Sequence, residues 1–306
     1  MMTPDGLQHR SQLLQAIRCF FLENSYIEVD TPQRLPVVIP ESNLIPFMSE
    51  GCFLQTSPEL CMKRLLARGC ERIFQICHCF RKEEHGRLHQ SEFTMLEWYH
   101  RGSDYFDLMR QCEELFCFLA AQCAAMPGVV DDSTIRWNGT TVSLAAPWDR
   151  LTVADAFEQY AGVSVKEALL TDMFDELLVT EIEPHLGNEH PVFLYEYPVE
   201  RALLARRSAQ NPTVAERFEL YVAGLELANG FSELVDPQEQ QSRFMEEIAQ
   251  IRLTREQKTE LPRLFLEEIG KIDASAGIAL GVDRLCMLFM GVTDIAMVLP
   301  FSFEEL

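Results

Sequence analysis

The chain has 306 residues, 47% of them hydrophobic, which suits one large domain with a substantial core. Its formal net charge of −21 argues against a broad basic surface for nucleic acid, although an acidic protein can still carry a local basic patch. No apolar run reaches the roughly 18 residues of a membrane-spanning helix, and residues 1–10 are polar and lack the apolar core of a signal peptide.

The ten cysteines are scattered, and none of them forms a Cys-x-x-Cys pair. Cys77 and Cys79 flank His78 inside a predicted strand, without a second such pair elsewhere in the sequence. Small buried thiols in a reducing compartment explain this usage better than zinc sites or disulfides do. We therefore expect a cytoplasmic protein that is not attached to a membrane.

The first predicted elements are a helix and a strand. From residue 7 the sequence has helical periodicity, and residues 26–32 form a β-prone run that ends at Pro32. The apolar stripe of the helix consists of Leu13, Leu14, Ile17, Phe20 and Phe21.

A second helix is predicted after a short strand over residues 53–56. Serine at the N-cap and proline at the first helical position, here Ser57 and Pro58, are a strong start signal, and residues 60–67 continue the helix. Glu59 in the first turn would complement the helix dipole, which is compatible with a role in binding a cation.

The most informative stretch is a predicted hairpin. Residues 73–83 and 93–99 are apolar, aromatic and β-prone enough to form two strands, and the charged segment between them would be a flexible tip.

One face of this hairpin is unusually polar. Because residues two apart share a face of a strand, Arg81 would lie with Glu83, and Glu97 with Tyr99. A strand buried in a core would not place a guanidinium, two carboxylates and a phenol on one face. The pattern predicts a functional site, with a solvated edge carrying surface ion pairs as the alternative.

The middle third of the chain carries no catalytic pattern. Residues 105–125 form an amphipathic-helix pattern, an Asn-Gly turn joins two strands over residues 135–144, and helices are predicted over residues 152–160 and 173–182. No repeat or low-complexity linker marks a second domain.

A second polar hairpin is predicted around Ala223 and Gly224. With this two-residue turn, Tyr221 lies opposite Glu226, and Glu219 is a diagonal neighbour on the same face. Carboxylates so placed repel each other unless a cation lies between them, and Mg²⁺ typically takes one or two carboxylates plus substrate phosphates. The spacing therefore predicts that Glu219 and Glu226 bind Mg²⁺.

The first hairpin resembles motif 2 of the class II aminoacyl-tRNA synthetases, closest to the lysyl branch. The residues that carry the resemblance are Phe-Arg-Lys-Glu-Glu at 80–84, Arg-Leu-His at 87–89 and Glu-Phe-Thr-Met-Leu-Glu-Trp-Tyr at 92–99. The helix, strand and proline before it resemble motif 1. Gly-Ile-Ala-Leu-Gly-Val-Asp-Arg-Leu at 277–285, followed by an apolar helix through Met290, resembles motif 3.

Three motifs in the order and spacing of this superfamily cover nearly the whole chain. The resemblance implies an α+β fold, the class II aminoacyl-tRNA synthetase catalytic fold, with a mixed, mainly antiparallel β-sheet flanked by helices. It further implies a single catalytic domain over residues 1–306 and a homodimer formed through the motif 1 region.

The resemblance also implies how ATP is bound. When an amino-acid carboxylate attacks the α-phosphate, two anions meet, and a fixed guanidinium is needed between them. Arg81 would take this catalytic role, and Arg284 would supply a second catalytic guanidinium on the triphosphate. The implied ATP-binding residues are Arg81, Lys82, Glu83, Arg87, His89, Gln90, Phe93, Glu226, Leu227, Gly281 and Arg284. Glu219 and Glu226 would hold Mg²⁺ here as well.

A lysine pocket is implied by Asn-Gly-Phe-Ser-Glu at residues 229–233, which matches the lysyl branch. Glu97 and Glu233 would form an acidic well for the substrate ε-ammonium, and Glu59 would bind the α-amino group. A long, flexible cation also needs apolar walls along its stem. The implied lysine-binding residues are Ser57, Pro58, Glu59, Glu97, Tyr99, Asn229, Phe231, Glu233 and Ala279.

We expect this protein to lack one part of a lysyl-tRNA synthetase. Those enzymes carry an N-terminal anticodon-binding OB domain, and only a few residues precede the predicted first helix here. Catalytic motifs without that domain resemble the elongation factor P–lysine ligases, as does Ala279, where lysyl-tRNA synthetases usually have glycine. This resemblance implies ATP-dependent activation of lysine or (R)-β-lysine as an aminoacyl-adenylate and its transfer to a lysine side chain of elongation factor P, without anticodon recognition.

Two other functions stay open. An enzyme charging tRNA without an anticodon domain is favoured by residues 203–212, which look more like the true synthetases. A non-catalytic paralogue that senses an amino acid is disfavoured by the intact Arg81, Glu226 and Arg284.

Three positions depart from the lysyl pattern. Lys82 and Gln90 each replace an asparagine, and Ser91 replaces a proline. The longer Gln90 side chain still suits a contact with the nucleotide.

Overall fold

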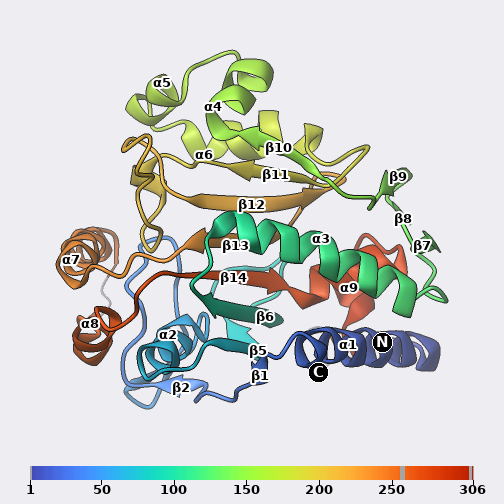
Figure 1. The fold of residues 1–306 in the computed structure, drawn as a ribbon, viewed down its shortest axis with the longest axis horizontal. Helices are drawn as coiled ribbons and strands as arrows, with labels where there is room; N and C mark the ends of the chain where they lie inside the picture. Colours follow the sequence, from blue (N-terminus) through green and yellow to red (C-terminus); the bar gives the residue numbers. More distant parts are fainter. Residues whose placement is uncertain (1, 256–258, 303–304, 306) are drawn as a thin grey trace.

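A mixed eight-stranded sheet forms the centre of the computed structural model, which describes residues 2–255, 259–302 and 305 (Figure 1). In spatial order its strands are β1 (Ile27–Glu28), β5 (Arg72–Phe80), β6 (Glu92–Arg101), β14 (Ser275–Gly281), β13 (Leu225–Ser232), β12 (Arg217–Val222), β11 (Val192–Tyr195) and β10 (Asp149–Thr152). The pairs β1–β5 and β10–β11 are parallel and the other neighbours are antiparallel.

Two small three-stranded sheets accompany the central sheet within the described residues. One consists of β2 (Arg34–Leu35), β4 (Cys52–Leu54) and β3 (Met48–Ser49), and the other of β7 (Val129–Asp131), β8 (Thr134–Trp137) and β9 (Thr140–Ser143). The expected α+β class, with a mixed and mainly antiparallel sheet flanked by helices, is confirmed.

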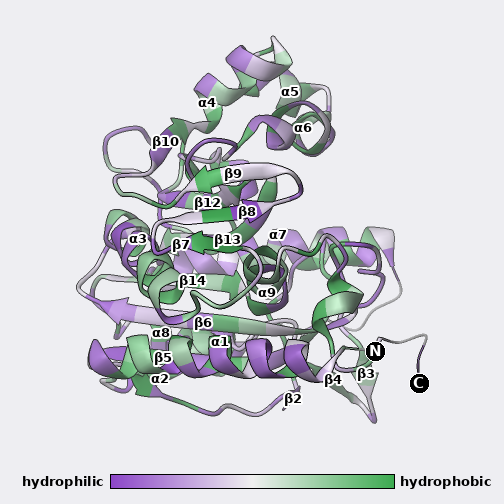
Figure 2. Cartoon of the chain, turned by 90° about the vertical axis from the view of Figure 1, so that its right-hand side faces the viewer, coloured by the Kyte–Doolittle hydropathy of each residue, from purple (hydrophilic) through white to green (hydrophobic). Residues whose placement is uncertain are grey.

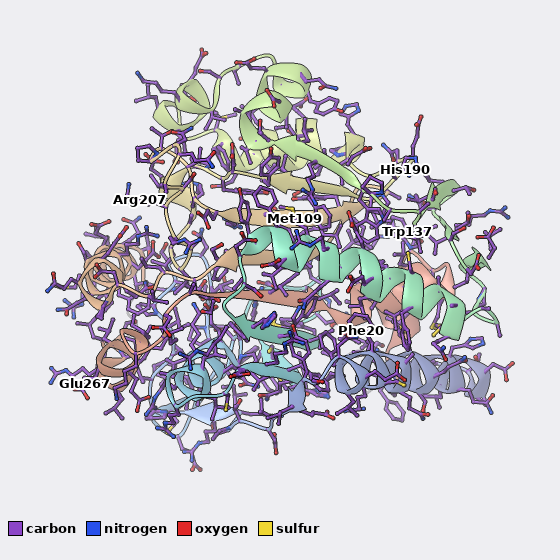
Figure 3. The ribbon with its side chains drawn as sticks, viewed as in Figure 1. Phe20, Met109, Trp137, His190, Arg207 and Glu267 are labelled. Carbon is purple, nitrogen blue, oxygen red and sulfur yellow. The ribbon has the colours of Figure 1, made fainter. Side chains whose placement is uncertain are left out.

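The helices α1 (Pro4–Glu23), α3 (Tyr105–Gln122) and α9 (Val282–Met290) cover one face of the sheet (Figure 1). The main core lies beneath them and includes Phe20 of α1 and Met109 of α3 (Figure 3). In Figure 2, α1 alternates between hydrophilic and hydrophobic turns, as expected of a helix with one buried stripe.

The remaining helices lie on other sides of the sheet. The helix α2 (Glu59–Ala67) contacts β6 and α8 (Arg263–Ile269), which in turn packs on α7 (Pro237–Thr254). A second hydrophobic cluster joins β11 to α4 (Val153–Ala156), α5 (Val165–Leu170) and α6 (Phe174–Leu177). None of the helices in the described part of the chain is long and apolar enough to cross a membrane.

The predicted strand over residues 73–83 is too long, because β5 ends at Phe80. Arg81 and Glu83 lie beyond it, so the expectation that they share a strand face is wrong. Glu83 has a φ of 72°, in the left-handed region, which no strand residue adopts. The backbone N–H of Arg81 donates to the carbonyl oxygen of Ser91 at 2.8 Å and so holds the base of the loop.

Other boundaries also differ. Only two of the residues 26–32 form strand β1, which has a single neighbour in the sheet. The helix α2 starts at Glu59 with Pro58 as its N-cap, although the Ser57 Oγ still accepts from the Glu59 N–H at 3.0 Å. The helices α4 and α6 each continue into a π turn, and α3 is three residues shorter than predicted at its C-terminal end.

Candidate active site

The face of the sheet opposite α3 carries the polar side chains. Strand alternation buries Leu96 and Trp98 of β6 in the main core and turns Glu97 and Tyr99 to the other side. There they line a cavity of about 360 Å³. Glycine or alanine on the adjacent strand β14, such as Ala279 opposite Glu97, leaves room for this cavity.

Most of the residues singled out from the sequence meet in this cavity. Those that line it are Ser57, Glu59, Arg81, His89, Gln90, Phe93, Glu97, Tyr99, Glu226, Leu227, Asn229, Phe231, Ala279, Gly281 and Arg284. Those that do not line it are Pro58, Lys82, Glu83, Arg87, Glu219 and Glu233. Lining residues that the sequence did not indicate include Glu41, Glu84, Leu204 and Gly277.

A β-bulge determines which side chains of the second hairpin, β12 and β13, face the cavity. Tyr221 pairs with Glu226, as predicted, but Leu220 pairs with Ala228, so Leu227 has no partner across the strand pair. The pairing skips one residue, and Asn229 therefore faces the same side of the sheet as Glu226.

Gly277 allows the floor of the cavity to close. A Cβ atom at this position would lie 2.5 Å from the Glu233 Oε1 and would overlap the Tyr99 ring. Only glycine lets Tyr99 and Glu233 pack this tightly beneath β14.

Glu97 is a buried carboxylate held by neutral donors. The Ser57 Oγ donates to it at 2.6 Å and the Tyr99 hydroxyl at 2.8 Å. Burial raises the pKa of Glu97 to about 8, and the nearby charge of Glu59 adds to this rise. Among the described residues, no Lys, Arg or His forms an ion pair with Glu97, so a cationic ligand would be its natural partner.

Glu233 already has a cationic partner in the protein, which the sequence reasoning did not anticipate. The Lys63 Nζ contacts the carboxylates of both Glu59 and Glu233, and its side chain is only 2% exposed. It also lies 5.1 Å from the centre of the Phe231 ring. The i, i+4 spacing of Glu59 and Lys63 on α2 could have indicated their pair.

Lys63 keeps its charge despite being buried. Burial lowers its pKa, but the charges of Glu233 and Glu59 outweigh burial and raise it above the ordinary value. The expected acidic well therefore contains an internal ammonium group as well as two carboxylates.

The Arg81 guanidinium borders the cavity beside Phe93. Its Nε donates to the Thr56 carbonyl oxygen at 3.3 Å, its Nη1 lies 3.6 Å from Glu84, and its centre is 5.2 Å from that of the Phe93 ring. These contacts leave part of its planar donor set free for an anion.

Arg284 connects both hairpins at the other end of the cavity. Its Nη1 donates to the Glu226 carbonyl at 2.8 Å and lies 3.2 Å from the carboxylate of the same residue, and its Nε donates to the Leu88 carbonyl at 3.2 Å. It also contacts the His89 ring. Burial lowers the pKa of His89 and the charge of Arg284 lowers it further, which favours a neutral ring.

The hairpin tip is attached to the C-terminal segment. The Arg87 carbonyl accepts from the Ile295 N–H at 2.9 Å, and the Arg87 guanidinium donates to the Thr293 carbonyl at 3.4 Å, outside the cavity. Lys82 and Glu83 do not line the cavity either, so the ATP-binding roles implied for these three residues stay predictions.

Three carboxylates surround Tyr221. Its hydroxyl donates to Glu219 at 2.7 Å and to Glu183 at 3.2 Å, and Arg217 pairs with Glu219 at 2.5 Å. Burial is the main cause that raises the pKa of Glu183 to about 7, and the charges of Glu226 and Glu219 add to it. Glu183 was not indicated by the sequence.

The fit of a Mg²⁺ ion to this region is partial. Across residues 2–255, 259–302 and 305, no three His, Cys, Asp or Glu side chains form a ready metal site. The side chain of Glu226 is 36% exposed, and like charges accumulate around it. This donor set suits an ion that takes one or two carboxylates and completes its shell with phosphates and water.

Comparison with known proteins identifies the family to which nearly the whole chain belongs. The family model described as "tRNA synthetases class II (D, K and N)" matches residues 3–305. The chain belongs to the class II tRNA synthetase family.

Individual relatives show to which branch of this family the chain is similar. The chain is 37% identical to the elongation factor P–(R)-β-lysine ligase of Salmonella arizonae, and 36% and 35% identical to those of Salmonella gallinarum and an Enterobacter species. Each match covers 98% of this chain and 95% of the relative. This class II synthetase-family chain therefore belongs with the elongation factor P–(R)-β-lysine ligases, and its family membership implies an ATP-using ligase.

Proposed function

We propose that this chain activates lysine or (R)-β-lysine with ATP and transfers it to a lysine side chain of elongation factor P. The observation that carries the proposal is Glu97, a buried carboxylate without a cationic partner among the described residues, in one cavity with Arg81 and Arg284. The names of the relatives supply the acceptor.

The reaction takes two steps. The amino-acid carboxylate attacks the α-phosphate of ATP, a P–O bond forms, and pyrophosphate leaves. The acceptor amine then attacks the carbonyl carbon, an amide bond forms, and AMP leaves. Arg81 would hold the carboxylate against the α-phosphate, because its planar donor set fits two anions at once.

The other side chains would position the two substrates. Glu97, assisted by Glu233, would bind the ε-ammonium, and Phe231 with Tyr99 would flank the aliphatic stem. Phe93 would stack on adenine, and Arg284 with His89 would hold the triphosphate. Lys82, Glu83 and Arg87 would join them after the hairpin tip folds over ATP.

Mg²⁺ would be held by Glu226, with Glu219 as a second ligand, and would neutralise charge on the phosphates of ATP. Glu219 would have to give up one of its present donors, since Arg217, Tyr197 and Tyr221 all contact it. We further propose a single catalytic domain that does not recognise the anticodon, homodimers through α1 and β1, and a cytoplasmic location.

The activation step can be tested by lysine-dependent exchange of pyrophosphate into ATP. We expect exchange with lysine and (R)-β-lysine and none with glutamate, whose side chain would bring a second negative charge against Glu97. Exchange that is equally fast without any amino acid would contradict the proposal.

Replacing Glu226 by Gln should raise the Mg²⁺ concentration needed for half-maximal exchange, because a neutral amide is a poorer ligand for a hard cation. The matched control is Glu158→Gln, an exposed position on another element. A Mg²⁺ titration curve that coincides with that of the control would count against a metal role for Glu226.

Lysine binding should strengthen as the pH rises from about 6 to about 8. With a pKa of about 8, Glu97 in the free protein is mostly protonated at pH 6 and about half ionised at pH 8, and binding of an ammonium group favours its ionised form. Binding therefore releases a proton, and the affinity rises by at most about tenfold per pH unit for each proton released. Calorimetric titrations in buffers of different ionisation enthalpy would measure the release. An affinity that falls with pH would refute this linkage, and Glu97→Gln should flatten the slope.

A further inference from the structure

The carboxylates at the amino-acid end of the cavity outnumber the protein cations that pair with them. Lys63 contacts Glu59 and Glu233, whereas Glu97 is held by hydroxyl groups. This leaves Glu41, a residue that the sequence reasoning did not single out.

Glu41 is held in place by its backbone. Its carbonyl oxygen accepts from the Arg255 Nη2 at 3.0 Å, and the N–H of Ser42 donates to Glu247 at 2.5 Å. Glu41 lines the same cavity as Ser57, Glu59 and Arg81. Among the described residues, its carboxylate has no hydrogen bond or ion pair.

The charges around Glu41 favour binding of a cation beside its carboxylate. Burial raises the pKa of Glu41 to about 7, the charge of Glu59 adds to the rise, and Arg81 opposes it. If Arg81 holds the substrate carboxylate, the amino nitrogen, two or three bonds from the carboxylate carbon, lies near Arg81, and Glu41 lines the same cavity close enough to Arg81 for the two charges to interact. Glu59 can serve that amino group only in competition with Lys63.

We propose that Glu41 binds the amino group next to the substrate carboxylate, the α-amino group of lysine or the β-amino group of (R)-β-lysine. Glu97 then binds the distant ε-ammonium, and Lys63 pairs with Glu59 and Glu233. The two carboxylates without protein cations match the two ammonium groups of a diamino acid. This inference rests on the proposed function, because it presumes that such a substrate enters the cavity.

The test compares three ligands by calorimetry with the full chain: L-lysine, (R)-β-lysine and 6-aminohexanoate, which has the carboxylate and the ε-ammonium but lacks the second amino group. Glu41→Gln should weaken both diamino acids about 30-fold or more, the loss typical of truncating one partner of a buried charge pair. The affinity for 6-aminohexanoate should stay within about twofold of wild type.

Two further variants sharpen the result. Glu158→Gln, an exposed position on another element, should leave all three affinities unchanged, and Glu41→Asp should restore part of the preference for lysine over 6-aminohexanoate that Glu41→Gln loses. Equal weakening of all three ligands in Glu41→Gln, or no weakening of any, would overturn the inference while the proposed function stands. If the wild-type protein binds none of the three, the proposed function fails, and the inference fails with it.

Discussion

Arg81→Ala should slow lysine-dependent adenylate formation by about 10²–10³-fold, the usual loss when one donor to a developing charge is removed. Among the described residues, the guanidinium makes only a long hydrogen bond with the Thr56 carbonyl, a long ion pair with Glu84 and a contact with the Phe93 ring. Its removal should therefore leave the fold intact. Single-turnover measurement of adenylate, with saturating ATP and lysine, isolates the chemical step.

The matched control for this variant is Arg207→Ala, which removes an exposed arginine that pairs with Glu239 at 3.0 Å (Figure 3). It should form adenylate at the wild-type rate. Arg81→Ala with a rate equal to that of the control would remove Arg81 from the reaction.

Glu97→Gln should lose lysine activation steeply and discriminate less against norleucine, which has an uncharged side chain of similar length. Truncating one partner of a desolvated charge pair costs about 2–5 kcal/mol, or about 30-fold to several thousand-fold in affinity. The same change should leave norleucine activation near its wild-type level, because norleucine has no ε-ammonium to lose. Exchange assays with both amino acids side by side give the ratio.

A buried glutamate outside the site provides the control for Glu97. Glu113 on α3 accepts from the Trp148 N–H at 2.9 Å, and Glu113→Gln should affect stability and not the ratio. Glu233 is a less suitable position for this test, because its neutralisation would also remove one of the two carboxylates that pair with Lys63. If Glu97→Gln lowers the activation of lysine and norleucine equally, Glu97 does not recognise the ε-ammonium.

The fold was predictable where local patterns are strong. The amphipathic stripe of α1, the Asn-Gly hairpin and the two-residue turn between β12 and β13 all occur as expected, because each depends on residues close in sequence. The extent of β5 was not predictable, since the left-handed Glu83 and the hydrogen bond between Arg81 and Ser91 depend on the closed loop.

The candidate site, like the fold, was predictable only where neighbouring residues in the sequence carry the signal. Many of the cavity residues within the three motifs were identified from the sequence, since their types and order carry the resemblance, although Glu84 and Gly277 were not. Lys63, Glu183 and Glu41 were not, because they lie outside those motifs and only the folded chain brings them beside the predicted residues. The bulge at Leu227, which turns Asn229 to the cavity, likewise depends on the pairing of whole strands.

The acceptor decides between the proposed ligase and an enzyme that charges tRNA. The most direct measurement incubates the protein with ATP, Mg²⁺ and labelled (R)-β-lysine or lysine, and then offers unmodified elongation factor P and bulk tRNA in separate reactions. We predict label on a lysine side chain of elongation factor P, release of AMP, and no label on tRNA. Label that appears on tRNA and not on elongation factor P would contradict it.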